Sequence, residues 1–178
     1  LRTLSQALPP TCYSECMVTM GSDAPDFTLP GLDGPRYSLH EAREAGPVLL
    51  VFWQAGCGAC KMVAPYLTRL REAYENIGWT FWTIAQDGPE DARRFVREQG
   101  FRPAVLVDGP ALEVSDLYDP PATPTFYLIE PGAGVTLEVD GFDKQALNDI
   151  SRRVAGYTGS GYVEIAPADD GNPPFKPG

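Results

Sequence analysis

Two cysteines separated by two residues are the side chains of this 178-residue chain best suited to chemistry. Cys57 and Cys60 lie in "FWQAGCGACKMVAPYL", after an apolar run and before a helical pattern. On the first turn of a helix their Cα atoms would be about 5 Å apart, within the roughly 4.4–6.8 Å that a disulfide needs. The pair could therefore form and break a disulfide without backbone movement.

The start of a helix gives the two cysteines different properties. Unpaired N–H groups and the positive end of the helix dipole favour an anion there, so we expect the pKa of Cys57 to be lowered. Cys60 lies one turn further in, and it would attack the Cys57 sulfur of a mixed disulfide and release the reduced partner. A C-x-x-C pair at a strand-to-helix junction favours this redox chemistry over two cysteines that merely pack.

A metal site is the second interpretation of the cysteines. Cys12 and Cys16 would complete a four-cysteine zinc site with the first pair, but they lie in a stretch without periodicity and have C-x3-C spacing. His40 is the only histidine of the chain, which excludes most histidine-based zinc and copper sites. We expect no metal and no cofactor.

Cys12 and Cys16 leave three alternatives open. They could form a disulfide of their own, act as a second redox pair that passes electrons to Cys57, or be inert residues that precede a natural start at Met17 or Met20. We favour the third.

The surrounding pattern predicts alternating strands and helices. "VLLVFW" at 48–53 is apolar without alternation, which is typical of a central strand covered on both faces. Apolar residues at helical spacing predict a helix from the cysteines to about Gly78: Val63, Leu67, Leu70, Tyr74 and Ile77. Further strands are expected at 80–85, 104–108, 125–130 and 135–140, and further helices at 38–46, 89–100, 111–118 and 143–155.

These elements predict an α/β fold with a mixed sheet between helices. We expect an N-terminal tail at 1–23, one domain at 24–156 that opens with a β-hairpin, and a Gly- and Pro-rich C-terminal tail at 157–178, extended on the surface.

Charge and hydropathy limit the partners. Fourteen Lys and Arg against 24 Asp and Glu give a net charge of −10, which argues against binding to nucleic acid or an anionic membrane. No stretch approaches the roughly 18 apolar residues of a membrane span. Proteins or small molecules are the expected partners.

The cysteine segment resembles the active-site motif of the thioredoxin superfamily, and "ATPTFYLI" resembles its second motif. "APDFTLPGLDG" is similar to the opening of the TlpA-like and redoxin (AhpC/TSA-like) branch. The resemblance implies a thioredoxin-like fold, Cys57 as the attacking and Cys60 as the resolving cysteine, and a cis Thr123–Pro124 bond beside them. It also implies that Thr123 offers backbone hydrogen bonds to a substrate chain.

Three residues near the cysteines are further candidates for contact with substrate. Trp53 would shield the disulfide, and Gly58 and Ala59 would adjust the thiolate. The chain also departs from the family, because Val51 and Val63 stand where relatives carry an aspartate or a glutamate that assists proton transfer.

The sequence therefore predicts a thiol-disulfide oxidoreductase that acts on protein or small-thiol disulfides with an unidentified electron donor or acceptor. One alternative is a peroxiredoxin-like peroxidase, although Leu50 and Gln54 occupy the proline and threonine positions of the peroxidase motif. Another is a binding module with incidental cysteines. A cytoplasmic location is expected, with an extracytoplasmic one, its targeting segment absent from this chain, as the alternative.

Overall fold

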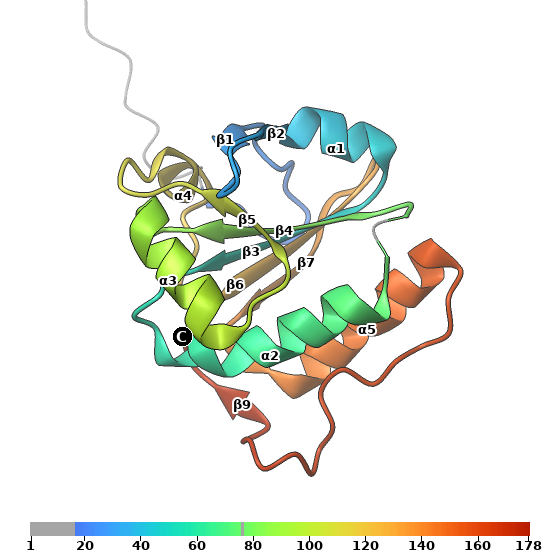
Figure 1. Cartoon of the computed structure of the whole chain (residues 1–178). Helices are drawn as coiled ribbons and strands as arrows, with labels where there is room; N and C mark the ends of the chain where they lie inside the picture. The colour runs from blue at the N-terminus through green and yellow to red at the C-terminus, as the bar shows by residue number, and fades with distance from the viewer. Residues whose placement is uncertain (1–16, 76) are drawn as a thin grey trace, which may run out of the picture.

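The computed structural model describes residues 17–75 and 77–178, so Cys12 and Cys16 lie outside the described residues. A five-stranded mixed sheet in the order β5-β4-β3-β6-β7 forms the centre of the molecule (Figure 1). Strand β3 pairs in parallel with β4 and antiparallel with β6. The strands of this sheet are β3 (Val48–Trp53), β4 (Thr80–Ala85), β5 (Ala104–Val107), β6 (Thr125–Glu130) and β7 (Gly134–Asp140).

Helices cover both faces of the sheet, as the order of the predicted elements indicated. The helices are α1 (Leu39–Ala45), α2 (Gly58–Ala73), α3 (Pro89–Gln99), α4 (Glu113–Tyr118) and α5 (Lys144–Thr158). Helices α2, α3 and α5 pack on one face, where Leu49, Val51 and Trp53 of β3 enter the core. Helices α1 and α4 pack on the other face against the alternate residues of β3, together with the short hairpin of β1 (Thr28–Pro30) and β2 (Arg36–Ser38).

Local sequence signals explain most helix boundaries. The Ser38 side chain caps α1 by accepting a hydrogen bond from the Glu41 amide, as the sequence predicted. Pro89 is in the first turn of α3, and Gly100 ends that helix in a left-handed conformation.

The predicted end of α2 near Gly78 is wrong. The helix ends at Ala73, Tyr74 is extended, and Ile77 is 65% exposed and outside the core. The Tyr74 hydroxyl is instead paired with Ser151 Oγ at 2.9 Å and accepts a hydrogen bond from the Val163 amide at 2.9 Å. These tertiary contacts hold Tyr74 against α5 and the segment after it, which a helical period in the sequence does not show.

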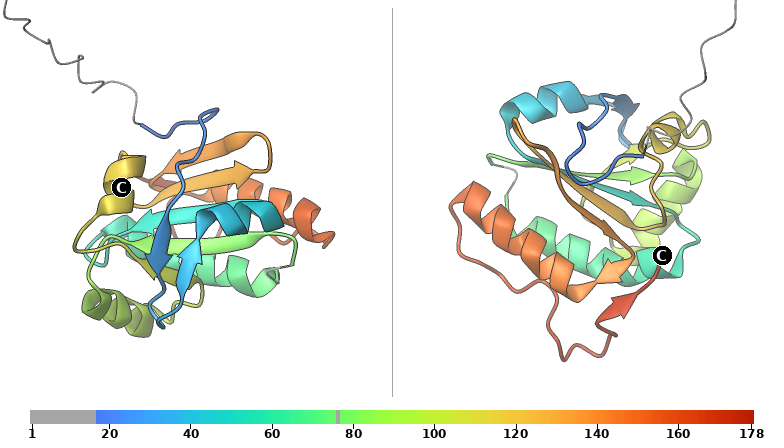
Figure 2. Two further views of the ribbon diagram at one scale, coloured as in Figure 1. Left: turned by 90° about the horizontal axis from the view of Figure 1, so that it is seen from above. Right: turned by 180° about the vertical axis from the view of Figure 1, so that it is seen from behind.

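The segment after α5 returns across the molecule and ends beside the start of α2 (Figures 1 and 2). Ile165 and Ala166 of this segment are buried. Its last strand, β9 (Phe175–Lys176), pairs antiparallel with β8 (Phe142–Asp143), a pairing that the sequence analysis missed. Among the helices of the described ranges, none has the length and apolar character needed to span a membrane.

Candidate active site

Cys57 occupies the N-cap of α2, directly after the loop that leaves β3. Its backbone is extended, and its Sγ accepts a hydrogen bond from the Cys60 amide at 3.1 Å. Serine, threonine and aspartate oxygens make the same bond at other helix starts, because the first amides of a helix have no partner within the helix. The sulfur of Cys57 is thus held where a negative charge is stabilised.

The electrostatic balance at Cys57 favours its thiolate. Burial raises its pKa, but hydrogen bonds from the Cys60 side chain and amide and from Thr123 outweigh this effect, so the pKa of Cys57 lies below its usual value. The thiol form also has a partner, since Sγ donates to the Thr123 carbonyl oxygen at 3.0 Å. Cys57 is half-buried and can be reached by a partner.

Cys60 has the opposite properties. It is 1% exposed, and burial together with the neighbouring Cys57 raises its pKa far above the usual value. Val51 and Val63 belong to the same apolar cluster and are also buried. The two positions at which relatives carry an acid therefore offer the Cys60 proton no acceptor in this chain.

The turn before β6 faces the cysteines. The Thr123–Pro124 peptide bond is cis, as the resemblance implied. Besides the contact of Thr123 with Cys57, the Pro124 carbonyl accepts from the Gly141 amide at 2.7 Å, and the Thr125 hydroxyl donates to the Ala122 carbonyl at 2.7 Å. These bonds fix the turn at the start of β6, next to the redox pair.

The remaining sequence candidates are separated by burial. Gly58 is exposed between the cysteines, whereas Ala59 is 2% exposed and offers a partner almost no surface. Trp53 is also 2% exposed, and its ring packs on Phe95 with centroids 4.3 Å apart. This burial argues against the expected contact between Trp53 and a substrate, because the indole lies beneath the site as part of the core.

The sequence analysis missed two residues that lie at the site. Asp87, at the end of β4, accepts a hydrogen bond from the Ala55 amide at 2.6 Å and so ties down the loop before Cys57. Lys176 of β9 lies over Gly58, since a β-carbon on Gly58 would be 3.8 Å from Lys176 Cε. A polar residue just after a central strand could have pointed to Asp87, but no local pattern places Lys176 near residue 58.

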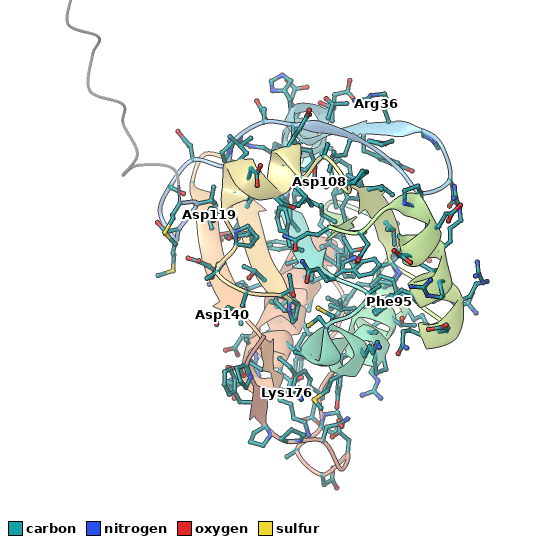
Figure 3. The ribbon with its side chains drawn as sticks, turned by 90° about the vertical axis from the view of Figure 1, so that its left-hand side faces the viewer. Arg36, Phe95, Asp108, Asp119, Asp140 and Lys176 are labelled. Carbon is teal, nitrogen blue, oxygen red and sulfur yellow. The ribbon has the colours of Figure 1, made fainter. Side chains whose placement is uncertain are left out.

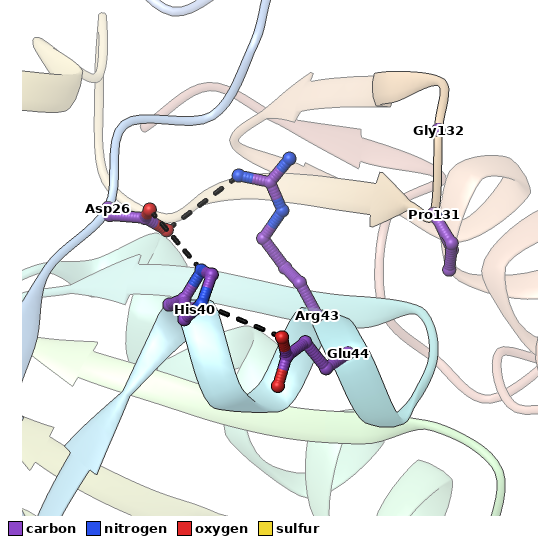
Figure 4. A pocket seen from close by; sticks show the side chains of 6 residues that line it. All are labelled: Asp26, His40, Arg43, Glu44, Pro131 and Gly132. Atoms are coloured by element: carbon purple, nitrogen blue, oxygen red, sulfur yellow. Dashed lines mark ion pairs between the residues drawn. The ribbon is translucent and has the colours of Figure 1, made fainter.

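His40 lies at a separate place on the surface. It is 69% exposed and within 3.8 Å of Asp26 and 3.6 Å of Glu44. These residues line an open pocket of about 400 Å³ with Arg43, Pro131 and Gly132 (Figure 4). Pro131 follows the end of β6 opposite to Pro124, so this pocket is remote from the cysteines.

Within the described ranges no group of three or more His, Cys, Asp or Glu residues is arranged to hold a metal ion.

Known thiol-disulfide oxidoreductases resemble this chain in sequence and in fold. The thiol-disulfide oxidoreductase ResA of Bacillus subtilis (strain 168) is 30% identical over 125 residues, which cover 70% of this chain and 69% of the relative. The thioredoxin domain of a thiol-disulfide oxidoreductase from Bacteroides vulgatus is 25% identical with a TM-score of 0.66 and covers 77% of this chain and 99% of that structure. A secreted disulfide oxidoreductase of Mycobacterium tuberculosis, homologous to E. coli DsbE, is 24% identical with a TM-score of 0.61, and the match covers 73% and 95% of the two chains.

A family assignment follows from the sequence itself. Residues 20–137 match the model of the AhpC/TSA family, which is more than half of the chain. The ResA relative and the thioredoxin-like fold agree with this match and define the chemistry as thiol-disulfide exchange. The chain therefore belongs to the AhpC/TSA family and is a thioredoxin-like thiol-disulfide oxidoreductase of the ResA and TlpA-like type.

Proposed function

We propose that Cys57 attacks the substrate disulfide and that Cys60 resolves the product. The Cys57 thiolate forms a bond to one substrate sulfur, the substrate disulfide breaks, and the other substrate sulfur leaves as a thiolate and takes a proton from water. The Cys60 thiol then gives its proton to water, and its sulfur displaces from Cys57 the substrate sulfur, which leaves as a thiolate and takes a proton from water. The substrate gains two electrons, and the enzyme ends with a Cys57–Cys60 disulfide.

The observation that carries this assignment is the position of the Cys57 sulfur. It lies 3.1 Å from the Cys60 amide and 3.0 Å from the Thr123 carbonyl oxygen, so a donor stabilises its anion and the cis-proline turn lies beside it. Cys60 remains protonated and buried until the mixed disulfide has formed, because its pKa is raised. The difference between the two thiols gives the order of the two steps.

Disulfide-bearing proteins are the substrates that the relatives of this enzyme indicate. For the binding of an extended substrate chain, we assign the partly exposed backbone of Thr123 and the exposed backbone of Gly58, whereas Pro124 and Ala59 are buried. The electron donor or acceptor would use the same surface, since it must reach the same sulfur.

An extracytoplasmic location fits this function better than a cytoplasmic one. The support is that a structural relative is a secreted disulfide oxidoreductase. Fractionation of the native host, with detection of this chain, tests the location.

The direction of electron flow is tested by the reduction potential, where about −270 mV fits a reductant and about −120 mV fits an oxidant.

The AhpC/TSA match makes a peroxidase the second candidate. The proline and threonine positions of the peroxidase motif hold Leu50, which is buried in the core, and Gln54, whose side chain donates to Gln86 at 2.9 Å. Rapid consumption of hydrogen peroxide with formation of a Cys57 sulfenic acid would favour peroxidase activity; slow consumption would favour disulfide exchange.

Reduction of insulin tests the main function. The wild type should reduce the insulin disulfides, and a Cys57→Ser variant should have no activity above the reductant alone. The Cys57→Ser, Cys60→Ser double variant tests the alternative that the protein is a binding module with incidental cysteines. Equal activity of the double variant and the wild type would contradict redox catalysis.

A further inference from the structure

The C-terminal segment is built into the active-site end of the fold. The buried ammonium of Lys144, at the start of α5, lies 2.5 Å from Asp170 Oδ1 and donates to the Pro167 carbonyl at 2.9 Å. Tyr66 of α2 donates to the second oxygen of Asp170 at 2.5 Å. The segment is thus fastened both to α5 and to the helix that carries the redox pair.

Additional contacts fix the path of the chain on either side of this anchor. Asn148 Oδ1 accepts from the amides of Ile165 and Ala166 at 3.0 and 2.9 Å. Further along, the Lys144 amide donates to the Pro174 carbonyl at 3.0 Å, and β9 then pairs with β8. Strand β9 is therefore held in one register where it reaches the cysteines.

The end of the chain lies beside both motifs of the site. A β-carbon on Gly178 would be 2.5 Å from the Thr123 carbonyl oxygen and 2.8 Å from Ala122 Cβ. A β-carbon on Gly58 would be 4.0 Å from the Lys176 ammonium nitrogen. Residues 175–178 thus form one wall along the cis-proline turn and the first turn of α2, and a substrate bonded to Cys57 must lie next to this wall.

Lys176 brings an available positive charge to this wall. Within residues 17–75 and 77–178, no carboxylate lies within ion-pair distance of its ammonium group. The chain as a whole carries a net charge of −10, so most of its surface repels an acidic partner. Lys176 places a cation beside the redox pair, where a partner of Cys57 must bind.

We propose that Lys176 is a specificity-determining residue that selects protein disulfides with a carboxylate side chain next to the cysteine attacked by Cys57. The proposal rests on the assignment of Cys57 as the attacking residue. A carboxylate at that place would accept a hydrogen bond from the Lys176 ammonium while the two sulfurs react. Because the ammonium is partly exposed, we expect the preference to be about two- to fivefold, the size of a screened ion pair.

Two matched peptides test this preference. Each carries one cysteine as a mixed disulfide with 2-thiopyridine, and the residue beside the cysteine is Glu in one peptide and Gln in the other. Release of thiopyridone by the reduced protein gives the second-order rate constant of the attack. The wild type should prefer the Glu peptide about two- to fivefold, and added salt should reduce the preference.

Substitutions at position 176 should change the ratio of the two rate constants. Lys176→Gln should bring it to about one, Lys176→Glu should reverse it, and Lys176→Arg should keep it. Arg36→Gln is the matched control, because Arg36 lies at the opposite end of the molecule (Figure 3), and it should keep the wild-type ratio.

The outcomes separate this proposal from the assignment of Cys57. If Cys57→Ser reacts as fast as the wild type, the assignment of the attacking cysteine fails. If attack requires Cys57 but the ratio is the same in Lys176→Gln and the wild type, only the role of Lys176 is overturned. An equal fall of both rate constants in Lys176→Gln also overturns it, since Lys176 would then act on the thiolate and not on the choice of substrate.

Discussion

Replacing Val63 with glutamate would place a carboxylate one helical turn beyond Cys60, where the structure has apolar atoms. Val63 is 2% exposed and lies in the same cluster as Cys60, and side chains three residues apart on a helix are neighbours. Apolar surroundings raise the pKa of a carboxyl group toward neutral pH, where it serves well as a general base. The Cys60 proton would then have an acceptor.

In Val63→Glu the resolving step should become faster while the free energy of unfolding falls. General base catalysis typically contributes about 10²–10⁴-fold, so we expect the resolving step to be about 100-fold faster in Val63→Glu than in Val63→Gln. Both variants lose the buried valine, worth about 1.5–3 kcal/mol, and bury a polar group without a partner at about 1–3 kcal/mol. Each should therefore lose about 2.5–6 kcal/mol of the free energy of unfolding.

A single-turnover experiment measures the resolving step directly. The reduced protein is mixed with a peptide disulfide, samples are quenched in acid, and intact mass gives the amounts of mixed disulfide and of the oxidised Cys57–Cys60 form. Urea unfolding of the same proteins gives the stability. Equal resolving rates in Val63→Glu and Val63→Gln, with both proteins folded, would refute the claim that Cys60 lacks a proton acceptor.

Three further results are expected. Because the pKa of Cys57 is lowered, its alkylation rate in Cys60→Ser, whose hydroxyl can still donate to the Cys57 sulfur, should reach its plateau at a lower pH than that of a free thiol. Gly141→Ala should be less stable than Gly132→Ala. Both glycines have a positive φ, but only a β-carbon on Gly141 would meet the backbone of β9, at 2.6 Å. Faster hydrogen exchange in β9 of Gly141→Ala would locate the effect there. Hydrogen bonds from Lys144 and Tyr66 lower the pKa of Asp170 to about 2, so its stabilising effect should be present above about pH 4 and lost toward about pH 2. Thermal unfolding against pH should show this loss in the wild type, whereas the same curve for Asp170→Asn should lack it.

The sequence predicted those parts of the fold that depend on local signals. The unbroken apolar run of β3, the capping box at Ser38 and the Gly100 end of α3 each have a cause within a few residues, and each was predicted close to its observed place. The cysteine pair was also found this way, because its spacing and its place at a helix start are local properties.

The missed features depend on contacts between distant residues. Tyr74 leaves the helical pattern to meet Ser151 and Val163. Lys176 reaches Gly58 because the Lys144–Asp170 ion pair and the β8–β9 pairing direct the last residues there. A Gly- and Pro-rich composition contains no information on what the backbone packs against, so it did not predict that Ile165 and Ala166 are buried.

Trapping of the mixed disulfide tests the proposed mechanism most directly. Cys60→Ser leaves the attack intact but removes the sulfur that displaces the partner, so a disulfide between Cys57 and its substrate should accumulate. Affinity capture of Cys60→Ser and of Cys57→Ser from lysate, followed by non-reducing and reducing gels, compares the two. Partners that are released by reductant and found only on Cys60→Ser are the predicted result; equal yields from the two variants, or trapping by Cys57→Ser alone, would contradict the proposed roles.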